Sequence, residues 1–286
     1  MAQLKIGTCS WKYESWKNIV YPDKPKINYL AEYAKKYDTV EVDQWFWSLF
    51  ENYEPALPKK KDVLVYAASI PANFRFSVKM PNSLTLTHYY NKKKNAALVE
   101  NPHFLSDELL LQFLESVDEL KENLGPLMLQ FEYLNKEKMP SLMHFMARLQ
   151  EFAVHFPEGY QFALETRNPN YLKKELFELL HEHKMGFVFL EGYYMPPVKE
   201  VYSAFKNDLT NFAVIRLHGP DRSGIEKISE GNWNKIYQPK DDDLSIIAAI
   251  VSDMLDRDVD VYLNVNNHYE GSAPITIEKI SSLLGI

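Results

Sequence analysis

The sequence predicts an α/β fold, a (β/α)8 TIM barrel in a single domain over residues 1–286, and two observations lead to it. Short apolar segments rich in β-branched and aromatic residues alternate with longer segments of helical period, which is typical of repeated βα units around a parallel sheet. The chain holds eight such short segments, and eight parallel strands separated by helices close most simply into a barrel. An open sheet with one added edge strand is the alternative that the pattern leaves open.

The predicted strands are short, and each is bounded by polar or turn-forming residues. They are Leu4–Cys9, Thr39–Val42, Phe74–Val78, Leu127–Phe131, Gln161–Leu164, Gly186–Leu190, Phe212–Leu217 and Val259–Val265.

Helix signals lie between these strands. Ser106 is a predicted N-cap followed by two acids, and Asp241 opens a helix with three aspartates at its positive end. The predicted helices are Ile27–Tyr37, Leu109–Leu124, Ser141–Phe156, Leu172–His183, Asp241–Arg257 and Pro274–Leu284. The predicted long connections are Pro55–Pro58 with Lys59–Asp62, and Asn82–Pro102 with its Lys92–Lys94 run.

Composition excludes several classes of protein. With 46% hydrophobic and 25% charged residues, the chain is typical of a globular protein rather than a disordered one. The net charge of −7 disfavours general nucleic-acid binding, which needs basic patches. Cys9 is the only cysteine, so an internal disulfide and a CxxC pair are excluded. We expect a cytoplasmic protein without membrane contact, because the first residues lack a leader pattern and the longest aliphatic stretch, Ile246–Val251, is too short to span a bilayer.

Polar side chains follow almost every predicted strand. In a β/α barrel the interior is apolar, so charged residues at the carboxyl ends of the strands point to the face where active sites form. They are Ser10 and Trp11 after the first strand, Glu41 and Asp43 at the second, Lys79 at the third, Gln130 and Glu132 at the fourth, Glu165 and Arg167 at the fifth, Glu191 at the sixth, Arg216 and His218 at the seventh, and Asn264, Asn266, Asn267 and His268 at the eighth.

These strand ends predict an anion-binding pocket, because guanidinium groups match phosphate or carboxylate oxygens. The favoured hypothesis is an enzyme that acts on a small phosphorylated or carboxylated ligand by acid/base chemistry. The predicted catalytic residues are Glu41, Glu165 and His218, and the predicted substrate-binding residues are Ser10, Trp11, Lys79, Gln130, Arg167, Arg216, Asn267 and His268. We expect Arg216→Ala to abolish binding of phosphate-like ligands with little loss of fold. The alternative is a polar plug, in which the cations only neutralise Glu41, Glu132 and Glu165.

Other chemistries receive less support. Glu41, Glu165, His218 and His268 could ligate a metal in a hydrolase, but HxH and HExxH spacings are absent and the neighbouring cations would repel a divalent ion, so no metal or cofactor is predicted. Ser10 has no GxSxG context, and no phosphate-cradling glycine loop is present. A nucleic-acid-binding or repair protein is a further alternative, with Trp11 or Trp16 stacking on an exposed base.

Seven ordered segments carry a family resemblance. They are IGTCSWKYESW with Tyr21–Pro22, TVEVDQWFW, FRFSVKMPNSLT, LMLQF, ALETRNPNYL, VIRLHG and VYLNVNNHYEGSAPITI. Over nearly the whole chain they resemble the DUF72 family, YecE-like β/α barrels whose function is unsettled. The resemblance implies the barrel fold and a pocket formed by Glu41, Lys79, Gln130, Glu165, Arg167, Arg216, His218 and Asn267.

The family is in turn distantly similar to endonuclease IV and xylose-isomerase-like barrels, which implies nucleic-acid or sugar-phosphate substrates and divalent-metal chemistry. Three positions depart from the family pattern. Asp43 stands where Asn is usual, Glu132–Tyr133 replaces a Pro-containing turn, and Asn168 replaces His after Arg167. The added negative charge at the rim disfavours DNA and leaves room for a cation.

Overall fold

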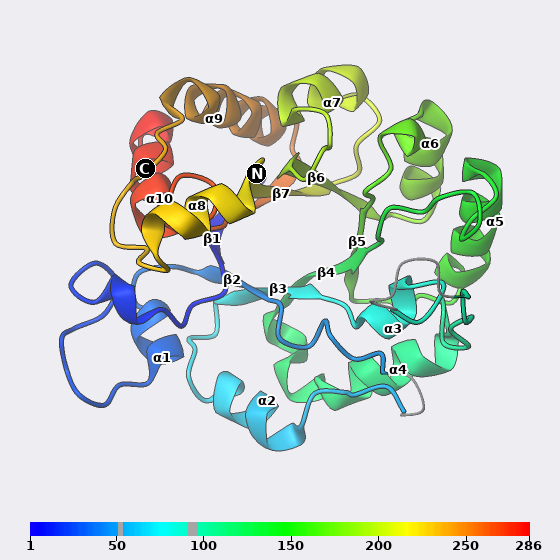
Figure 1. Ribbon diagram of the computed structural model, residues 1–286, viewed down its shortest axis with the longest axis horizontal. Helices are drawn as coiled ribbons and strands as arrows, with labels where there is room; N and C mark the ends of the chain where they lie inside the picture. The colour runs from blue at the N-terminus through cyan, green and yellow to red at the C-terminus, as the bar shows by residue number, and fades with distance from the viewer. Residues whose placement is uncertain (51–53, 91–96) are drawn as a thin grey trace.

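The computed structural model describes residues 1–50, 54–90 and 97–286, and within them eight parallel strands form one closed barrel in chain order (Figure 1). The Lys92–Lys94 run lies outside the described residues. The strands are β1 (Leu4–Cys9), β2 (Thr39–Val42), β3 (Arg75–Lys79), β4 (Leu124–Gln130), β5 (Gln161–Glu165), β6 (Gly186–Gly192), β7 (Phe212–Gly219) and β8 (Asp260–Val265). The predicted fold class is confirmed, and the open-sheet alternative is wrong because β1 pairs with β8.

Helices surround the barrel, as Figure 1 shows. They are α1 (Tyr29–Tyr33), α2 (Lys60–Ala67), α3 (Asn82–Thr85), α4 (Asp107–Ser116), α5 (Leu142–Ala153), α6 (Lys174–Glu182), α7 (Val198–Phe205), α8 (Arg222–Ser229), α9 (Asp241–Asp256) and α10 (Ala273–Leu284), with 3-10 turns η1 (Glu14–Trp16), η2 (Asp118–Asn123) and η3 (Pro169–Tyr171).

The predicted helices differ from the structure at their ends, and two of them show why. The helix predicted over Ile27–Tyr37 begins only at Tyr29, because the side chain of Asn28 accepts the backbone N–H of Ala31 and caps it there. The helix predicted to run to Leu124 ends at Ser116, and a 3-10 segment leads directly into β4. Helix α2 begins within the predicted connection Lys59–Asp62 and continues beyond it to Ala67, and α3 lies within the predicted connection Asn82–Pro102.

The barrel interior changes character along its axis. Side chains alternate along a strand, so residues two apart point the same way. A separate cluster of buried apolar side chains, which includes Met128, Ala163 and Val214, fills one part of the barrel interior. Polar side chains lie two residues further along the same strands, among them Gln130, Glu165 and Arg216. The interior is therefore an apolar layer beneath a polar layer.

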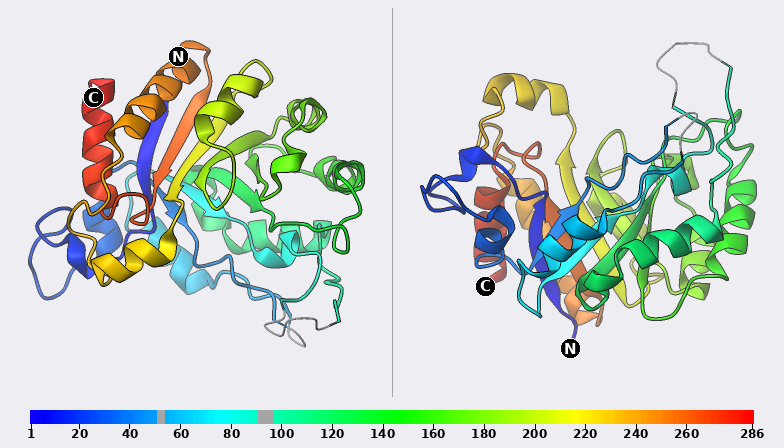
Figure 2. Two further views of the ribbon diagram at one scale, coloured as in Figure 1. Left: turned by 45° about the horizontal axis from the view of Figure 1, so that its top comes forward. Right: turned by 90° about the horizontal axis from the view of Figure 1, so that it is seen from below.

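The polar layer lies at the carboxyl ends of the strands. In the right-hand view of Figure 2, the N-terminus lies at one end of the barrel, and α8, which follows β7, lies at the other. The carboxyl ends of all eight strands therefore open on the same face.

No helix among the described residues has the length and apolar character that a membrane crossing requires.

Candidate functional site

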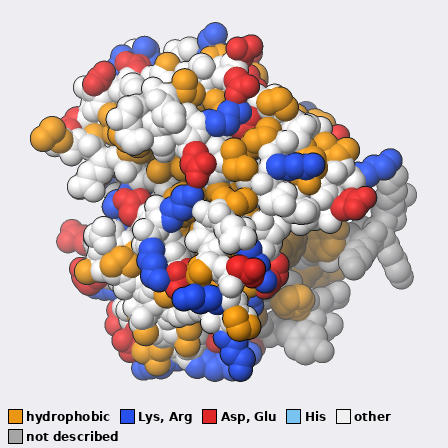
Figure 3. All heavy atoms as spheres, turned by 90° about the vertical axis from the view of Figure 1, so that its left-hand side faces the viewer, with side chains coloured by type: hydrophobic (Ala, Val, Ile, Leu, Met, Phe, Trp, Pro, Cys, Tyr) orange, Lys and Arg blue, Asp and Glu red, His pale blue; other side chains and the backbone are white. Residues whose placement is uncertain are grey.

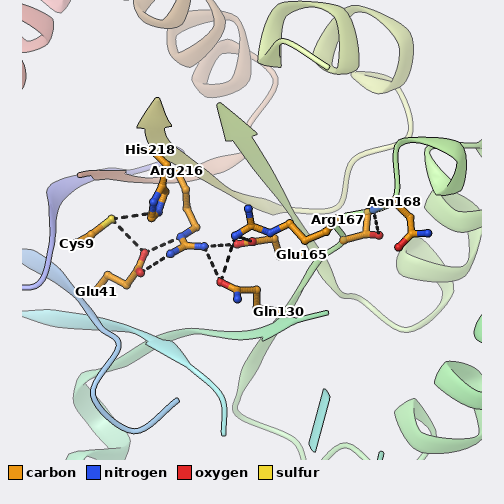
Figure 4. A network of polar contacts seen from close by, with 9 residues as sticks. Cys9, Glu41, Gln130, Glu165, Arg167, Asn168, Arg216 and His218 are labelled. Carbon is orange, nitrogen blue, oxygen red and sulfur yellow. Dashed lines mark hydrogen bonds and ion pairs between the residues drawn. The ribbon is translucent and has the colours of Figure 1, made fainter. Parts of the chain in front are cut away.

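Arg216 of β7 stands at the centre of a buried network drawn in Figure 4. Its Nε donates to Oε2 of Glu41 at 2.8 Å and its Nη2 donates to Oε1 of the same carboxylate at 2.6 Å. This bidentate geometry matches the guanidinium fork to both carboxylate oxygens. Arg216 and Glu41 are each only 1% exposed, so solvent does not weaken the pair.

The same guanidinium bridges to β4 and β5. Its Nη1 donates to Oε2 of Glu165 and, at 3.1 Å, to the amide oxygen of Gln130. Arg167 places Nη2 at 2.6 Å from the other oxygen of Glu165. Register explains the convergence, since Gln130 pairs with Glu165 across two neighbouring strands. The side chain of Arg216 thus ties β7 to three other strands, β2, β4 and β5.

The positive charges of this network hold Glu165 ionised. Burial alone would raise the pKa of Glu165, but the positive charges of Arg167, Arg216 and Lys79 outweigh it and hold that pKa below its usual range. Burial likewise opposes the charge of Arg216, yet Glu165 and Glu41 raise its pKa further. Glu165 is therefore a stable carboxylate and a poor proton donor. The polar-plug alternative describes this part of the site well.

A cavity of about 800 Å³ opens above the network. Its lining residues come from loops and strand ends all round the barrel. They are Cys9, Tyr13, Glu41, Asp43, Phe46, Trp47, Lys79, Asn82, Leu86, Tyr90, Gln130, Glu132, Tyr133, Arg167, Pro169, Tyr193, Tyr194, Arg216, His218, Arg222, Asn266 and His268.

Lys79 is the cation of the cavity that the network does not neutralise. Within the described part of the chain, no carboxylate lies within the 4.0 Å that defines an ion pair for its ammonium group. Its Nζ instead lies 4.0 Å from the centre of the Phe46 ring. Burial and the positive charge of Arg216 lower the pKa of Lys79, against the opposing pull of Glu41 and Glu165. An incoming anion would stabilise its charge.

Asp43 lines the cavity and was not among the predicted site residues. It reaches solvent through the cavity mouth, yet surrounding protein and the charge of Glu41 raise its pKa, while Lys79 lowers it less. A carboxyl group with a raised pKa accepts a proton more readily than an ordinary aspartate, which suits proton exchange with a ligand. The sequence carried the signal, because Asp43 lies two residues after Glu41 and so points to the same side of β2.

His218 lies beside this network and is 7% exposed. Its Nε2 lies 3.7 Å from Sγ of Cys9, and its Nδ1 has no hydrogen-bond partner among the described residues. Burial, followed by the charges of Arg216, Arg167 and Lys79, lowers the pKa of His218 well below its usual value. The imidazole is neutral at physiological pH. Burial and Glu41 raise the pKa of Cys9, so the thiol is not an activated nucleophile.

The metal hypothesis meets a competing contact. Among the described residues, one group of possible metal ligands converges, and it consists of Cys9, Glu41 and His218 within 4.8 Å of one another. Glu165 and His268, which the hypothesis also requires, do not belong to it. Both oxygens of Glu41 already accept hydrogen bonds from Arg216, whose charge would oppose a divalent ion at this point.

Three predicted binding residues lie outside the cavity lining. Trp11 is buried and packs edge-on against Tyr66. Ser10 has a positive φ of 71° and donates its backbone N–H to the carbonyl of Glu41. Asn267 accepts the backbone N–H of Ala273 at the start of α10. These contacts are structural, and the predicted binding roles remain untested.

His268 does line the cavity, where its Nε2 lies 3.0 Å from Glu226 of α8. Glu41, Lys79, Gln130, Arg167, Arg216 and His218 also line this cavity. Glu165, predicted as catalytic, is fully buried and does not line it. Trp16, the alternative stacking platform, is fully buried against Tyr13 and Tyr21.

Comparison with known proteins matches the model of the family described as "Protein of unknown function DUF72" over residues 5–286. The chain belongs to the DUF72 family. Among solved structures, a DUF72 family protein from Enterococcus faecalis V583 is 20% identical, with a TM-score of 0.70 over 99% of this chain and 96% of that one. A DUF72 family protein from Thermotoga maritima MSB8 is 21% identical, with a TM-score of 0.66 over 99% of this chain and 100% of that one. At this identity the likeness shows the fold. No curated protein matches the sequence.

The structure places the three departures from the DUF72 pattern. Asp43 faces the cavity, and Glu132 pairs with Lys138 at 2.7 Å at its rim. Asn168 is turned away from the cavity and holds the backbone of Leu134 through both ends of its amide, at 2.8 and 2.9 Å. Of the two added acids of this DUF72 protein, Glu132 is paired with Lys138, whereas Asp43 has no ion-pair partner among the described residues.

Proposed function

We propose that the cavity binds the anionic group of a small substrate at Lys79 and Arg167, and that acid/base chemistry follows at Asp43 and His218. The observation that carries this proposal is the ammonium group of Lys79, which lines the cavity without a carboxylate partner among the described residues. A partly buried cation without an ion-pair partner is costly, and a bound anion would reduce that cost.

The charges of the cavity support an anion at this point. The carboxylates of Glu41 and Glu165 face the guanidinium groups of Arg216 and Arg167, so these four charges cancel. Lys79 then remains, and the nearby acid Asp43 has a raised pKa, so it is protonated more readily than an ordinary aspartate. The corner of the cavity around Lys79 therefore attracts anions.

The site offers two groups for proton chemistry. Asp43 has a raised pKa and access to solvent, which suits a general acid or base. His218 is neutral and buried, so its imidazole can donate or accept a hydrogen bond to a reacting atom. Glu41 and Glu165, predicted as catalytic, serve in this proposal to position Arg216 and to keep the network rigid.

A small ligand fits the surface better than a nucleic-acid polymer does. A polyanion needs a continuous basic surface to release counterions. The face of the molecule shown in Figure 3 carries Lys and Arg intermixed with Asp and Glu, with no continuous basic stripe. The formal net charge of −7 also disfavours the binding of a polyanion.

The test is calorimetric titration of inorganic phosphate into the wild type and into Lys79→Met, which keeps the length of the side chain and removes its charge. We expect the substitution to weaken phosphate binding about ten-fold or more, as for loss of one charge-assisted contact. Lys174→Met on α6 is the matched control, because Lys174 is 69% exposed and pairs with the exposed Glu178.

Equal phosphate affinity in the wild type and Lys79→Met would overturn the anion site, as would the absence of any phosphate binding. A similar loss in Lys174→Met would show that the effect is one of net charge and would also contradict the proposal.

A further inference from the structure

Exposed aromatic side chains surround the mouth of the cavity. Trp47, Tyr90, Tyr133 and Tyr194 are 65%, 69%, 61% and 98% exposed, and with Tyr193 they form what we call the aromatic collar. They follow four different strands, β2, β3, β4 and β6, yet all line one cavity. Large exposed aromatic surface that gathers in one place marks a site of interaction.

The turn after β6 holds part of the collar in a strained conformation. Tyr193 and Tyr194 have positive φ values of 52° and 64°, which cost energy for residues with a side chain. Gly192 precedes them with a φ of 126°, and a Cβ there would lie 2.3 Å from the carbonyl oxygen of Gly219. The turn is thus fixed against β7, and strain of this kind is typical of ligand sites.

Tyr193 joins the collar to the anion site. Its ring centre lies 4.4 Å from the guanidinium carbon of Arg167 and 5.3 Å from the ring of His218. An anion held by Arg167 would therefore lie next to an aromatic wall. A ligand that fills both regions needs an anionic group and a flat apolar group close together.

The size of the cavity leads to the same requirement. A volume of about 800 Å³ lies in the range of pockets that enclose whole cofactors or drug-sized ligands. A phosphate or carboxylate group alone would leave most of it empty. The remaining space lies against Phe46 and the collar, where planar rings stack well.

We propose that the substrate of this site is a small molecule that carries an aromatic ring beside its anion, in the class of nucleoside monophosphates and aryl phosphates. The inference rests on the proposed function, since Lys79 and Arg167 hold the anion, and it adds the collar as the part that selects the ring.

The experiment compares phosphate-bearing probes in one calorimetric series. The probes are inorganic phosphate, ribose 5-phosphate, 4-nitrophenyl phosphate and the four ribonucleoside 5′-monophosphates. We expect at least one ring-bearing probe to bind about ten-fold more tightly than ribose 5-phosphate, as stacking on exposed aromatics predicts. Trp47→Ala and Tyr194→Ala should remove most of that advantage while ribose 5-phosphate binding stays the same.

Phe50→Ala is the matched control, because Phe50 is 52% exposed on the same loop as Trp47 and does not line the cavity. It should bind every probe as the wild type does. Phosphate binding without any gain from a ring would overturn the collar and leave the proposed function standing. Failure of all probes would overturn both. Tighter binding of a single-stranded oligonucleotide than of any monophosphate, with a steep salt dependence, would contradict a small-molecule substrate.

Discussion

The two sides of the cavity floor use charge differently. On one side, Arg216 is buried between Glu41 and Glu165 and every charge has a partner. On the other side, Lys79 lies over an aromatic ring without an ion-pair partner among the described residues, and Asp43 has a raised pKa. The first arrangement is complete without a ligand, whereas the second is completed by one. Charged residues at the end of a barrel strand therefore need not share a role.

Removal of Arg216 is the strongest test of the paired side. Arg216→Met leaves two buried carboxylates facing each other, so we expect a loss of roughly 3–5 kcal/mol in the free energy of unfolding, measured with urea. This replaces the expectation from sequence that Arg216→Ala would spare the fold. Arg222→Met is the control, because Arg222 is 60% exposed in its pair with Glu226 and should cost less than about 1 kcal/mol. Equal losses in the two variants would contradict a structural role for Arg216.

A second prediction concerns the pH dependence of the paired side. Because the folded pKa of Glu165 lies below its ordinary 4.5, its contribution to stability is full above that value and is lost as the pH falls through the folded pKa. We expect Glu165→Gln to cost about 2 kcal/mol at pH 7 and to weaken the acid dependence of unfolding below about pH 5. Glu178→Gln on α6 is the exposed control. An unchanged acid profile in Glu165→Gln would contradict the role of the network.

The smallest expected effect belongs to Asp43. Its protonation removes a negative charge beside Lys79, so sulfate, which stays doubly charged across this range, should bind several-fold more tightly as the pH falls from 7 toward the raised pKa of Asp43. Asp43→Asn should bind sulfate more tightly at pH 7 and with a weaker dependence on pH. The same pH dependence in wild type and variant would show that another group titrates.

Most of the fold could be predicted from local patterns. The bounds of β1 and β2 agree with the structure, because β-branched runs ended by polar residues signal a strand. The start of β4 was missed because Leu124 fits the apolar spacing of the preceding helix as well. Helix α2 was missed because its sequence has little apolar periodicity and buries only Val63.

The sequence predicted most of the residues of the candidate site, but it did not predict which of them contact one another. Alternation along β5 and β7 places Glu165, Arg167, Arg216 and His218 on the interior side, and that information is local. Which carboxylate Arg216 contacts depends on strands far apart in the sequence. Burial of Trp11 and exposure of Trp47 likewise depend on the packing of distant loops, and neither follows from the residue type.

A crystal structure of the protein with inorganic phosphate tests the difference between the two sides most directly. We predict phosphate oxygens within hydrogen-bond distance of Nζ of Lys79 and of the guanidinium of Arg167, with the contacts of Arg216 to Glu41 and Glu165 unchanged. Phosphate bound to Arg216 in place of either carboxylate, or bound away from Lys79, would contradict the account.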